Sequence, residues 1–185
     1  MIDSLCDQAV GKDVAVVGLY CDFLGQQEQT TTNMLGVILK QLVGREGIPK
    51  YTQEAFREAK KEFGGRGLQL PDMVDALKRT ITSPLRLFIC IDALDECTPK
   101  HRRELLESLQ EIVRVSPGAR VFLTGRPHID GEITRCFSKA LRILLRPTPG
   151  DIIDYLKMRL SDDTIMDDKL RENIERIIPE KISER

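Results

Sequence analysis

The sequence predicts an α/β fold built around a mainly parallel β-sheet, and three observations support this. Short apolar runs rich in β-branched residues recur along the chain, as expected of strands buried on both faces. Between them lie segments whose apolar residues repeat every three or four positions, which is the pattern of amphipathic helices. This alternation builds βαβ units, which make the strands parallel. Finally, acidic residues follow one of the runs, at the end of a strand where open α/β sheets bind ligands.

The individual elements follow from these patterns in chain order. Thr98 and Pro99 form a good helix start, a hydroxyl N-cap followed by proline in the first turn. Gly44 is expected to end an earlier helix. The expected strands cover residues 14–20, 87–91, 120–124 and, as a candidate last strand, 141–145. The expected helices cover residues 30–43, 51–63, 71–82, 99–115, 151–160 and 168–178.

Composition excludes several classes of partner. With 41% apolar and 31% charged residues, the 185-residue chain is globular and long enough to bury a core. Its net charge of −1 gives no general attraction to nucleic acid or to an anionic membrane, and few aromatic residues could stack on bases. No apolar run approaches the roughly 18 residues that span a membrane. We therefore expect neither nucleic acid nor membrane as a partner.

The five cysteines indicate a reducing compartment. Their number is odd and no C-x-x-C pair occurs, which opposes a disulfide framework or a zinc site and favours a cytoplasmic location. Cys97 precedes His101 by four residues, a spacing that could bring a thiol and a base together in a nucleophilic site. The neighbouring carboxylates should raise the pKa of this thiol, so we expect no nucleophile here.

The acidic cluster Asp92, Asp95 and Glu96 is the main candidate site. No base accompanies these carboxylates locally, so they would repel one another unless a divalent cation bound them, and magnesium needs only one or two carboxylates. An apolar strand ending in aspartate has the form of a Walker B segment, in which the aspartate, here Asp92, holds Mg²⁺. Glu96, or as second choice Asp95, would then polarise the attacking water. The alternatives are a core strand followed by a solvated acidic turn, and for Glu96 an acid near a helix start.

Several motifs together resemble one family. The segment D-A-L-D-E from Asp92 to Glu96 resembles the Walker B of the NACHT group of STAND-class P-loop NTPases, most closely its fungal nephrocystin-like members. The segment V-F-L-T-G-R-P that follows some thirty residues later resembles the sensor strand of that group. Residues 14–43 and the D-I-I-D-Y-L segment at 151–156 resemble further parts of the family. The resemblance covers about residues 10 to 180.

The resemblance implies a three-layer α/β/α P-loop fold with a mainly parallel sheet, followed by the start of a helical subdomain. The expected domains are an incomplete NACHT-type core at 1–147 and the helical start at 148–185. Intact members use Mg²⁺ and ATP as nucleotide-gated switches, and fungal members are linked to non-self recognition and programmed cell death. Arg126 and Thr124, at the end of the sensor strand, are the candidate nucleotide-binding residues, with Arg126 beside Asp92 and in reach of a γ-phosphate. The alternative for Arg126 is a surface arginine held by Pro127.

Residues 1–185 contain no G-x-x-x-x-G-K-[ST] phosphate-binding loop. The pair Gly11-Lys12 is followed by Asp13 instead of serine or threonine, and Cys6 replaces the first glycine. We therefore expect a truncated domain that lacks the Walker A strand, binds no cofactor tightly and does not hydrolyse ATP by itself. The open sheet edge and uncovered apolar helix faces around Ile152, Leu156, Ile174 and Ile177 would favour self-association or a protein partner.

Three functions remain open at this point. The chain is expected to be a fragment or remnant of a NACHT-type signalling ATPase. The first alternative is a non-catalytic interaction module that docks on full-length relatives. The second is a magnesium-dependent phosphohydrolase that uses the acidic cluster directly.

Overall fold

A computed structural model describes residues 14–46, 69–81, 86–161 and 167–183, apart from some side chains near helix ends. The expected helix over residues 51–63 and the Gly11-Lys12 pair lie outside these residues. The chain divides into two compact units, Met1–Ala140 and Leu141–Arg185. The expected domain boundary between residues 147 and 148 stays a prediction.

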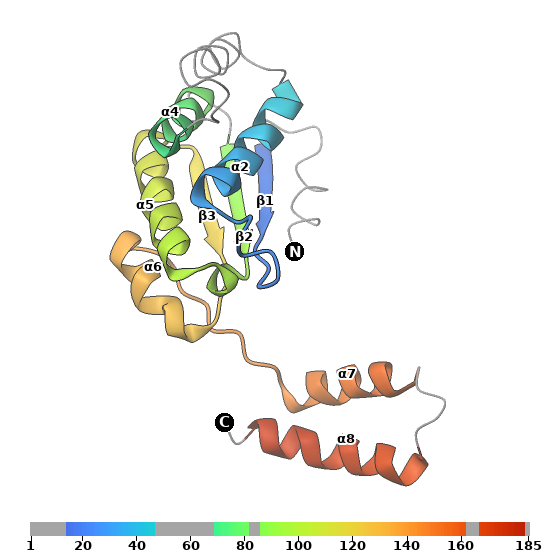
Figure 1. Ribbon diagram of the computed structural model, residues 1–185. Coiled ribbons are helices and arrows are strands. Elements are labelled where there is room, and N and C mark those ends of the chain that lie inside the picture. Colours follow the sequence, from blue (N-terminus) through green and yellow to red (C-terminus); the bar gives the residue numbers. More distant parts are fainter. Residues whose placement is uncertain (1–13, 47–68, 82–85, 162–166, 184–185) are drawn as a thin grey trace. The chain divides into compact units, whose positions relative to one another are not determined.

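The first unit is an α/β structure built on a parallel three-stranded sheet (Figure 1). Its strands β1 (Val14–Tyr20), β2 (Arg86–Asp92) and β3 (Ala119–Leu123) lie in the order β1-β2-β3, with the Walker B-like strand in the centre. Val17 is opposite Ile89 and Ile89 is opposite Val121, so alternate residues line one face. The predicted fold class, an α/β fold with parallel strands, is confirmed.

Three long helices cover this face of the sheet (Figure 1). They are α2 (Thr31–Glu46), α4 (Leu70–Thr80) and α5 (Pro99–Val115). Inward-facing residues of all three strands pack with them into one large apolar core. The opposite face holds a smaller cluster around Val16 and Cys90. Among the described residues the helices that reach the core lie on one face, so these residues show two of the three expected layers.

Most helix limits agree with the sequence prediction, but two C-terminal ends are wrong: α2 runs to Glu46 instead of residue 43, and α8 runs to Ser183 instead of residue 178. The helix α5 begins and ends as expected, and its N-cap Thr98 accepts a hydrogen bond from the backbone N–H of His101 at 3.5 Å. The helix α2 continues past Gly44 to Glu46, so this glycine does not end it. Glycine weakens a helix by only about 1 kcal/mol, and the burial of Leu39 and Leu42 against the core offsets that cost.

The turns at the carboxyl ends of the strands are short. The 3-10 helix η1 (Leu94–Glu96) follows β2, while η2 (Pro127–Ile129) and α6 (Asp130–Cys136) follow β3. All these segments lie at the edge of the sheet where the acidic cluster was predicted.

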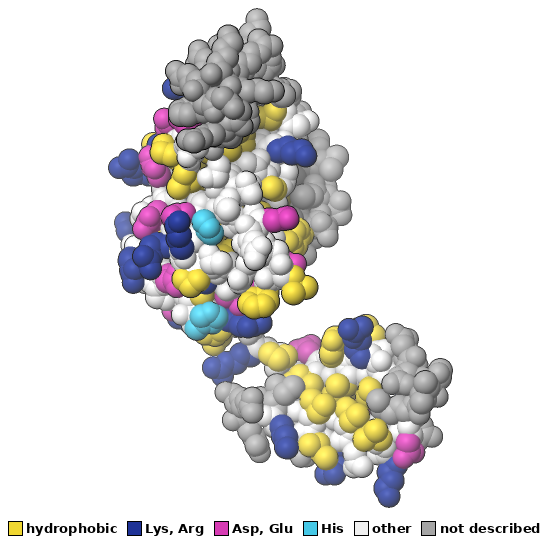
Figure 2. Space-filling view, viewed as in Figure 1, with side chains coloured by type: hydrophobic (Ala, Val, Ile, Leu, Met, Phe, Trp, Pro, Cys, Tyr) yellow, Lys and Arg dark blue, Asp and Glu magenta, His cyan; other side chains and the backbone are white. Residues whose placement is uncertain are grey.

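The second unit contains two helices, α7 (Pro149–Ser161) and α8 (Asp168–Ser183), that pack against each other. Figure 2 shows hydrophobic side chains gathered on one face of this unit. The apolar faces expected to be uncovered are partly covered, because Ile152 is buried and Leu156 and Ile174 are half-buried, whereas Ile177 is exposed. None of the helices in the described parts of the chain combines the length and the apolar character needed to cross a membrane.

The candidate strand at residues 141–145 is wrong. These residues have no regular secondary structure, and the side chains of Leu141 and Leu145 are 87% and 83% exposed. A run this short becomes a strand only where a neighbouring strand supplies hydrogen bonds.

Candidate functional site

The candidate site lies at the carboxyl edge of the sheet, where β2 ends at Asp92 and β3 is followed by Thr124. Because the two strands are parallel neighbours, their ends meet, and the hydroxyl of Thr124 donates a hydrogen bond to Oδ1 of Asp92. The same hydroxyl oxygen accepts the backbone N–H of Ala93 at 2.9 Å, and the carbonyl of Thr124 accepts that of Leu94 at 2.9 Å. Thr124 therefore holds both the carboxylate and the turn that follows it.

This turn has an unusual backbone. Ala93 is left-handed, with φ 53° and ψ 44°, a conformation that costs a residue with a Cβ about 1 kcal/mol. The reversal sends Leu94 into the core, where it is fully buried, and starts η1. Asp95 and Glu96 are thereby presented at the same edge as Asp92. Such local strain is typical of functional turns.

Arg126 pairs with the two later carboxylates of the cluster. Its Nε lies 3.4 Å from Oδ2 of Asp95, and one terminal nitrogen lies 3.2 Å from Oε1 of Glu96. Its backbone N–H also donates to Oδ1 of Asp95 at 3.2 Å. The Asp95 side chain is 5% exposed while that of Arg126 is 71% exposed, so the guanidinium covers a buried carboxylate from the solvent side. The repulsion expected within the cluster is thus relieved by a base thirty residues away.

A second arginine supports the turn from inside. Arg102 on α5 is only 5% exposed and makes a two-point ion pair with Glu132 of α6, through contacts of 3.0 and 2.7 Å. Its remaining terminal nitrogen donates to the carbonyl of Cys97 at 3.0 Å, and the side chain of Gln26 donates to the carbonyl of Glu96 at 2.6 Å. The side chains of Arg102 and Gln26 thus donate hydrogen bonds to backbone carbonyls of the turn, and these bonds fix its position.

The residues present are compatible with magnesium held mostly by water and phosphate. The described residues contain no group of three or more His, Cys, Asp or Glu side chains placed to hold a metal ion. Magnesium needs no such group, because it binds through one or two carboxylates and fills its other positions with water and phosphate oxygens. Asp92 at the strand end is the residue that could supply this single carboxylate.

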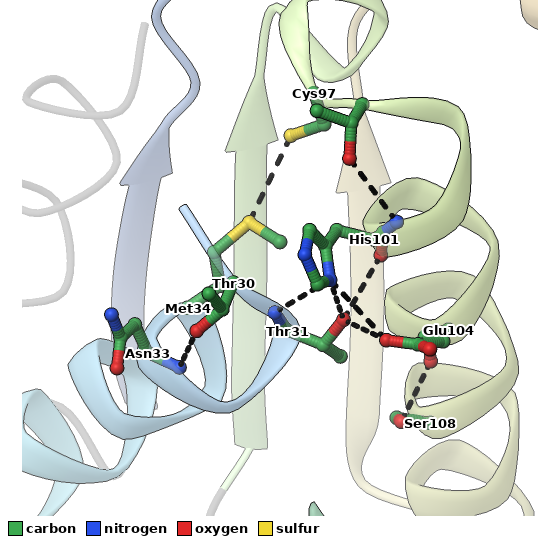
Figure 3. A network of polar contacts seen from close by, with 9 residues as sticks. Thr30, Thr31, Asn33, Met34, Cys97, His101, Glu104 and Ser108 are labelled. Atoms are coloured by element: carbon green, nitrogen blue, oxygen red, sulfur yellow. Dashed lines mark hydrogen bonds and ion pairs between the residues drawn. The ribbon is translucent and has the colours of Figure 1, made fainter. Parts of the chain in front are cut away.

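The Cys97 thiol and the His101 ring contact different partners. Nδ1 of His101 lies 3.1 Å from the hydroxyl of Thr31 and 3.3 Å from a carboxylate oxygen of Glu104, in the network drawn in Figure 3. The sulfur of Cys97 instead contacts Cys21. The charges of Asp95 and Glu96 act to raise the pKa of the Cys97 thiol, as expected, but the hydrogen bond with Cys21, aided by the charge of Arg102, outweighs them and the effect of burial and lowers this pKa.

Sequence reasoning missed Arg102, Gln26 and the partnership of Cys21 with Cys97. For the cysteines a signal existed, since each follows a predicted strand or its turn, and the carboxyl ends of parallel strands meet at one edge. No local pattern marks Gln26, which lies in an exposed loop, or Arg102, which is one of several basic residues on its helix.

The fold and the site together define an α/β protein with a parallel sheet and a cluster of acidic and basic side chains at its carboxyl edge. The chain belongs to the nephrocystin 3 N-terminal family, whose model it matches over residues 1–126. The match includes all three strands, the acidic cluster and Arg126. No curated protein and no solved structure matches the chain.

Proposed function

We propose that the chain carries the Walker B and sensor segments of a nucleotide-gated signalling ATPase of the NACHT group, within the STAND class of P-loop NTPases. The observation that supports this best is the position of Asp92. It ends the central strand of three parallel strands, and Thr124 from the neighbouring strand binds its carboxylate. Membership of the nephrocystin 3 N-terminal family agrees with this interpretation.

In this proposal each residue of the cluster has a separate role. Asp92 would hold Mg²⁺, which supplies positive charge to the phosphates of ATP. Glu96, or Asp95 in second place, orients and polarises the attacking water. Arg126 contacts the γ-phosphate through its planar guanidinium. Its ion pairs with Asp95 and Glu96 would then exchange for phosphate, so that this arginine reports which nucleotide is bound.

The phosphate-binding loop is the part of such a site that residues 1–185 do not contain. The free edge of β3 in the described sheet is where the resemblance places the Walker A strand. We infer that this chain by itself neither binds ATP tightly nor hydrolyses it. By resemblance to fungal members, we place its role in cytoplasmic signalling linked to non-self recognition.

The experiment is to add a Walker A strand and phosphate-binding loop at the N-terminus and to measure ATP binding by calorimetry with and without Mg²⁺. ATP binding should appear in the extended chain, and Asp92→Ala should remove its magnesium-dependent part, roughly tenfold or more in affinity. Glu96→Gln should leave binding intact and slow turnover. Equal affinity with and without Mg²⁺ would contradict the assignment of Asp92.

Arg126 has its own test in the same extended chain. Arg126→Ala should reduce the preference for ATP over ADP, because only ATP carries the γ-phosphate. Arg114→Ala is the matched control, since this arginine is exposed on α5 away from the cluster. If the Arg126 variant prefers ATP over ADP as strongly as the unchanged chain does, Arg126 does not contact the γ-phosphate.

The second candidate function is a non-catalytic module that docks on a full-length relative. One observation favours it, namely that Arg126 forms ion pairs with both Asp95 and Glu96, the carboxylates that a hydrolytic site would use. Failure of the extended chain to bind ATP, together with tight binding of residues 1–185 to a full-length relative, would favour this function. A direct phosphohydrolase would show magnesium-dependent hydrolysis of a simple phosphate ester by the chain alone.

A further inference from the structure

Two cysteines from distant parts of the sequence meet beside the acidic cluster. Cys21 directly follows β1 and Cys97 directly follows η1, 76 positions further on. Their sulfur atoms lie 2.9 Å apart. Both residues are buried, with exposures of 8% and 2%, and no disulfide joins the described cysteines.

The backbone of each cysteine is held in place independently. The N–H of Cys21 donates to the carbonyl of Asp92 at 3.0 Å, which ties the end of β1 to the end of β2. The carbonyl of Cys97 accepts from Arg102, and its N–H donates to the carbonyl of Leu94 at 3.2 Å. The surrounding structure therefore keeps the two sulfur atoms together.

The geometry favours a bond between the sulfur atoms over a shared metal ion. A disulfide needs a separation of about 2.05 Å, which is less than an ångström from the one found. Two thiolates on one zinc ion, each about 2.3 Å from it in tetrahedral geometry, would lie roughly 3.8 Å apart. The third nearby sulfur, in the thioether of Met34, lies 3.8 Å from Cys97 (Figure 3).

We propose that Cys21 and Cys97 are a redox-sensitive pair that forms a reversible disulfide when the chain meets a peroxide. The thiolate of one cysteine attacks an oxygen of hydrogen peroxide, giving a sulfenic acid and releasing hydroxide. The second sulfur then attacks the sulfenic sulfur, forms the S–S bond and expels a second hydroxide. The two thiol protons convert both hydroxides to water, so two thiols and one peroxide give one disulfide and two waters.

The disulfide would connect the loop after β1 to the turn that carries Asp95 and Glu96. Oxidation would thereby restrict the movement of the turn that carries Asp95 and Glu96, whichever of the proposed functions the candidate site serves. Closing so long a loop should also raise the thermal midpoint by roughly 5–15 °C. The bond itself depends only on the two thiols, so a failed nucleotide experiment and a failed oxidation experiment are separate results.

The test oxidises the fully reduced 185-residue chain with a small excess of hydrogen peroxide, blocks the remaining thiols and isolates the monomer band on a non-reducing gel. Digestion with trypsin and a glutamate-specific protease gives peptide 13–28, whose one cysteine is Cys21, and peptide 97–100, whose one cysteine is Cys97. We expect these two peptides to be linked in most of the oxidised monomer and to separate on reduction with dithiothreitol. When the chain is unfolded in urea before oxidation, the share of Cys21 that is linked to Cys97, instead of to another cysteine, should be several-fold lower.

Variants and a metal measurement complete the test. Cys21→Ala and Cys97→Ala should each abolish the linked peptide and the rise in thermal midpoint, while the matched control Cys136→Ala, on α6, should retain both. The wild-type result stands even if one variant fails to fold. The proposal is overturned if the folded chain shows no link between the two peptides, or if linkage is equally frequent in urea. It is also overturned if the purified chain holds a stoichiometric soft metal ion that the Cys97→Ala variant lacks.

Discussion

At the scale of single residues, the buried charge of Arg102 holds the turn of the candidate site in place. The guanidinium of Arg102 is enclosed between α5, α6 and the turn after β2, and Glu132 is its only carboxylate partner among the contacts of the described residues. A buried arginine is costly to leave unpaired, so Glu132 keeps Arg102 in the position from which it binds the turn. The bond from Arg102 holds the pKa of Glu132 below its ordinary value of 4.5.

The first prediction concerns this pair and pH. Because the folded-state pKa of Glu132 is lowered, its stabilisation is fully present above about pH 4.5 and is lost as the pH falls through the folded-state value. Glu132→Gln should cost about 2 kcal/mol in the free energy of unfolding at pH 7, and this difference should shrink in acid. Urea unfolding from pH 7 to pH 3 measures it. Glu107→Gln, an exposed change on α5, is the control and should cost little at any pH.

The second prediction concerns Gly125, in the sensor-like segment. A Cβ built there would lie 2.6 Å from Cδ1 of Ile129, a residue that is 1% exposed. Gly125→Ala should therefore cost about 1–2 kcal/mol in stability. Ile129→Val removes the clashing methyl group, so the double variant should lose less than the sum of the two single variants in urea unfolding. Simple additivity would show that contact with Ile129 is not the reason for the glycine.

At the scale of elements, the outer edge of β1 is covered by a side chain. Gln41 on α2 accepts the N–H of Gly18 at 2.9 Å and donates to its carbonyl at 2.7 Å, as a neighbouring strand would. In the described sheet β1 pairs only with β2, so these two backbone groups would otherwise lack a partner strand. The carboxamide therefore completes the hydrogen bonding of an edge strand and protects it from pairing with another chain.

The third prediction follows from this contact. Gln41→Leu keeps an apolar side chain of similar size but leaves the amide and carbonyl of Gly18 without their partner, at a cost of about 1–3 kcal/mol. The exposed neighbour Lys40 provides the matched change, and Lys40→Leu should be nearly neutral. The midpoints of urea unfolding of the two variants give the comparison. Equal losses would mean that the hydrogen bonds to Gly18 contribute little.

At the scale of the whole molecule, apolar surface remains uncovered in both units when each is considered by itself. In the first unit, Phe122 of the edge strand β3 is 38% exposed. In the second, the apolar run at 141–145 is exposed, as are Tyr155, Met158 and Leu170. Surfaces of this kind are typical of sites that contact another protein.

The fourth prediction is that residues 1–185 self-associate when purified alone. Sedimentation velocity over a wide range of concentration should show mass increasing with concentration. Replacing both Leu141 and Leu145 with lysine should weaken this association, whereas the control Val115→Lys, at an exposed position at the end of α5, should not. A concentration-independent monomer with one sharp thermal transition would show that the open sheet edge needs no partner. The fragment interpretation would then give way to the interaction module.

The sequence by itself determined the strands of the sheet, most helices and the edge where the acidic cluster lies. These features depend on local apolar periodicity and on the rule that the carboxyl ends of parallel strands lie at the same edge of a sheet. The ends of β1 and β2 and both ends of α5 were predictable to within a residue for this reason.

Only the tertiary structure decided which side chains meet at that edge. Arg126 pairs with Asp95 and Glu96, and Cys21 reaches Cys97 across 76 positions. The continuation of α2 past Gly44 depends likewise on burial against distant strands. Such contacts join residues far apart in the chain, and their geometry is set by packing of the whole core, which no local pattern encodes.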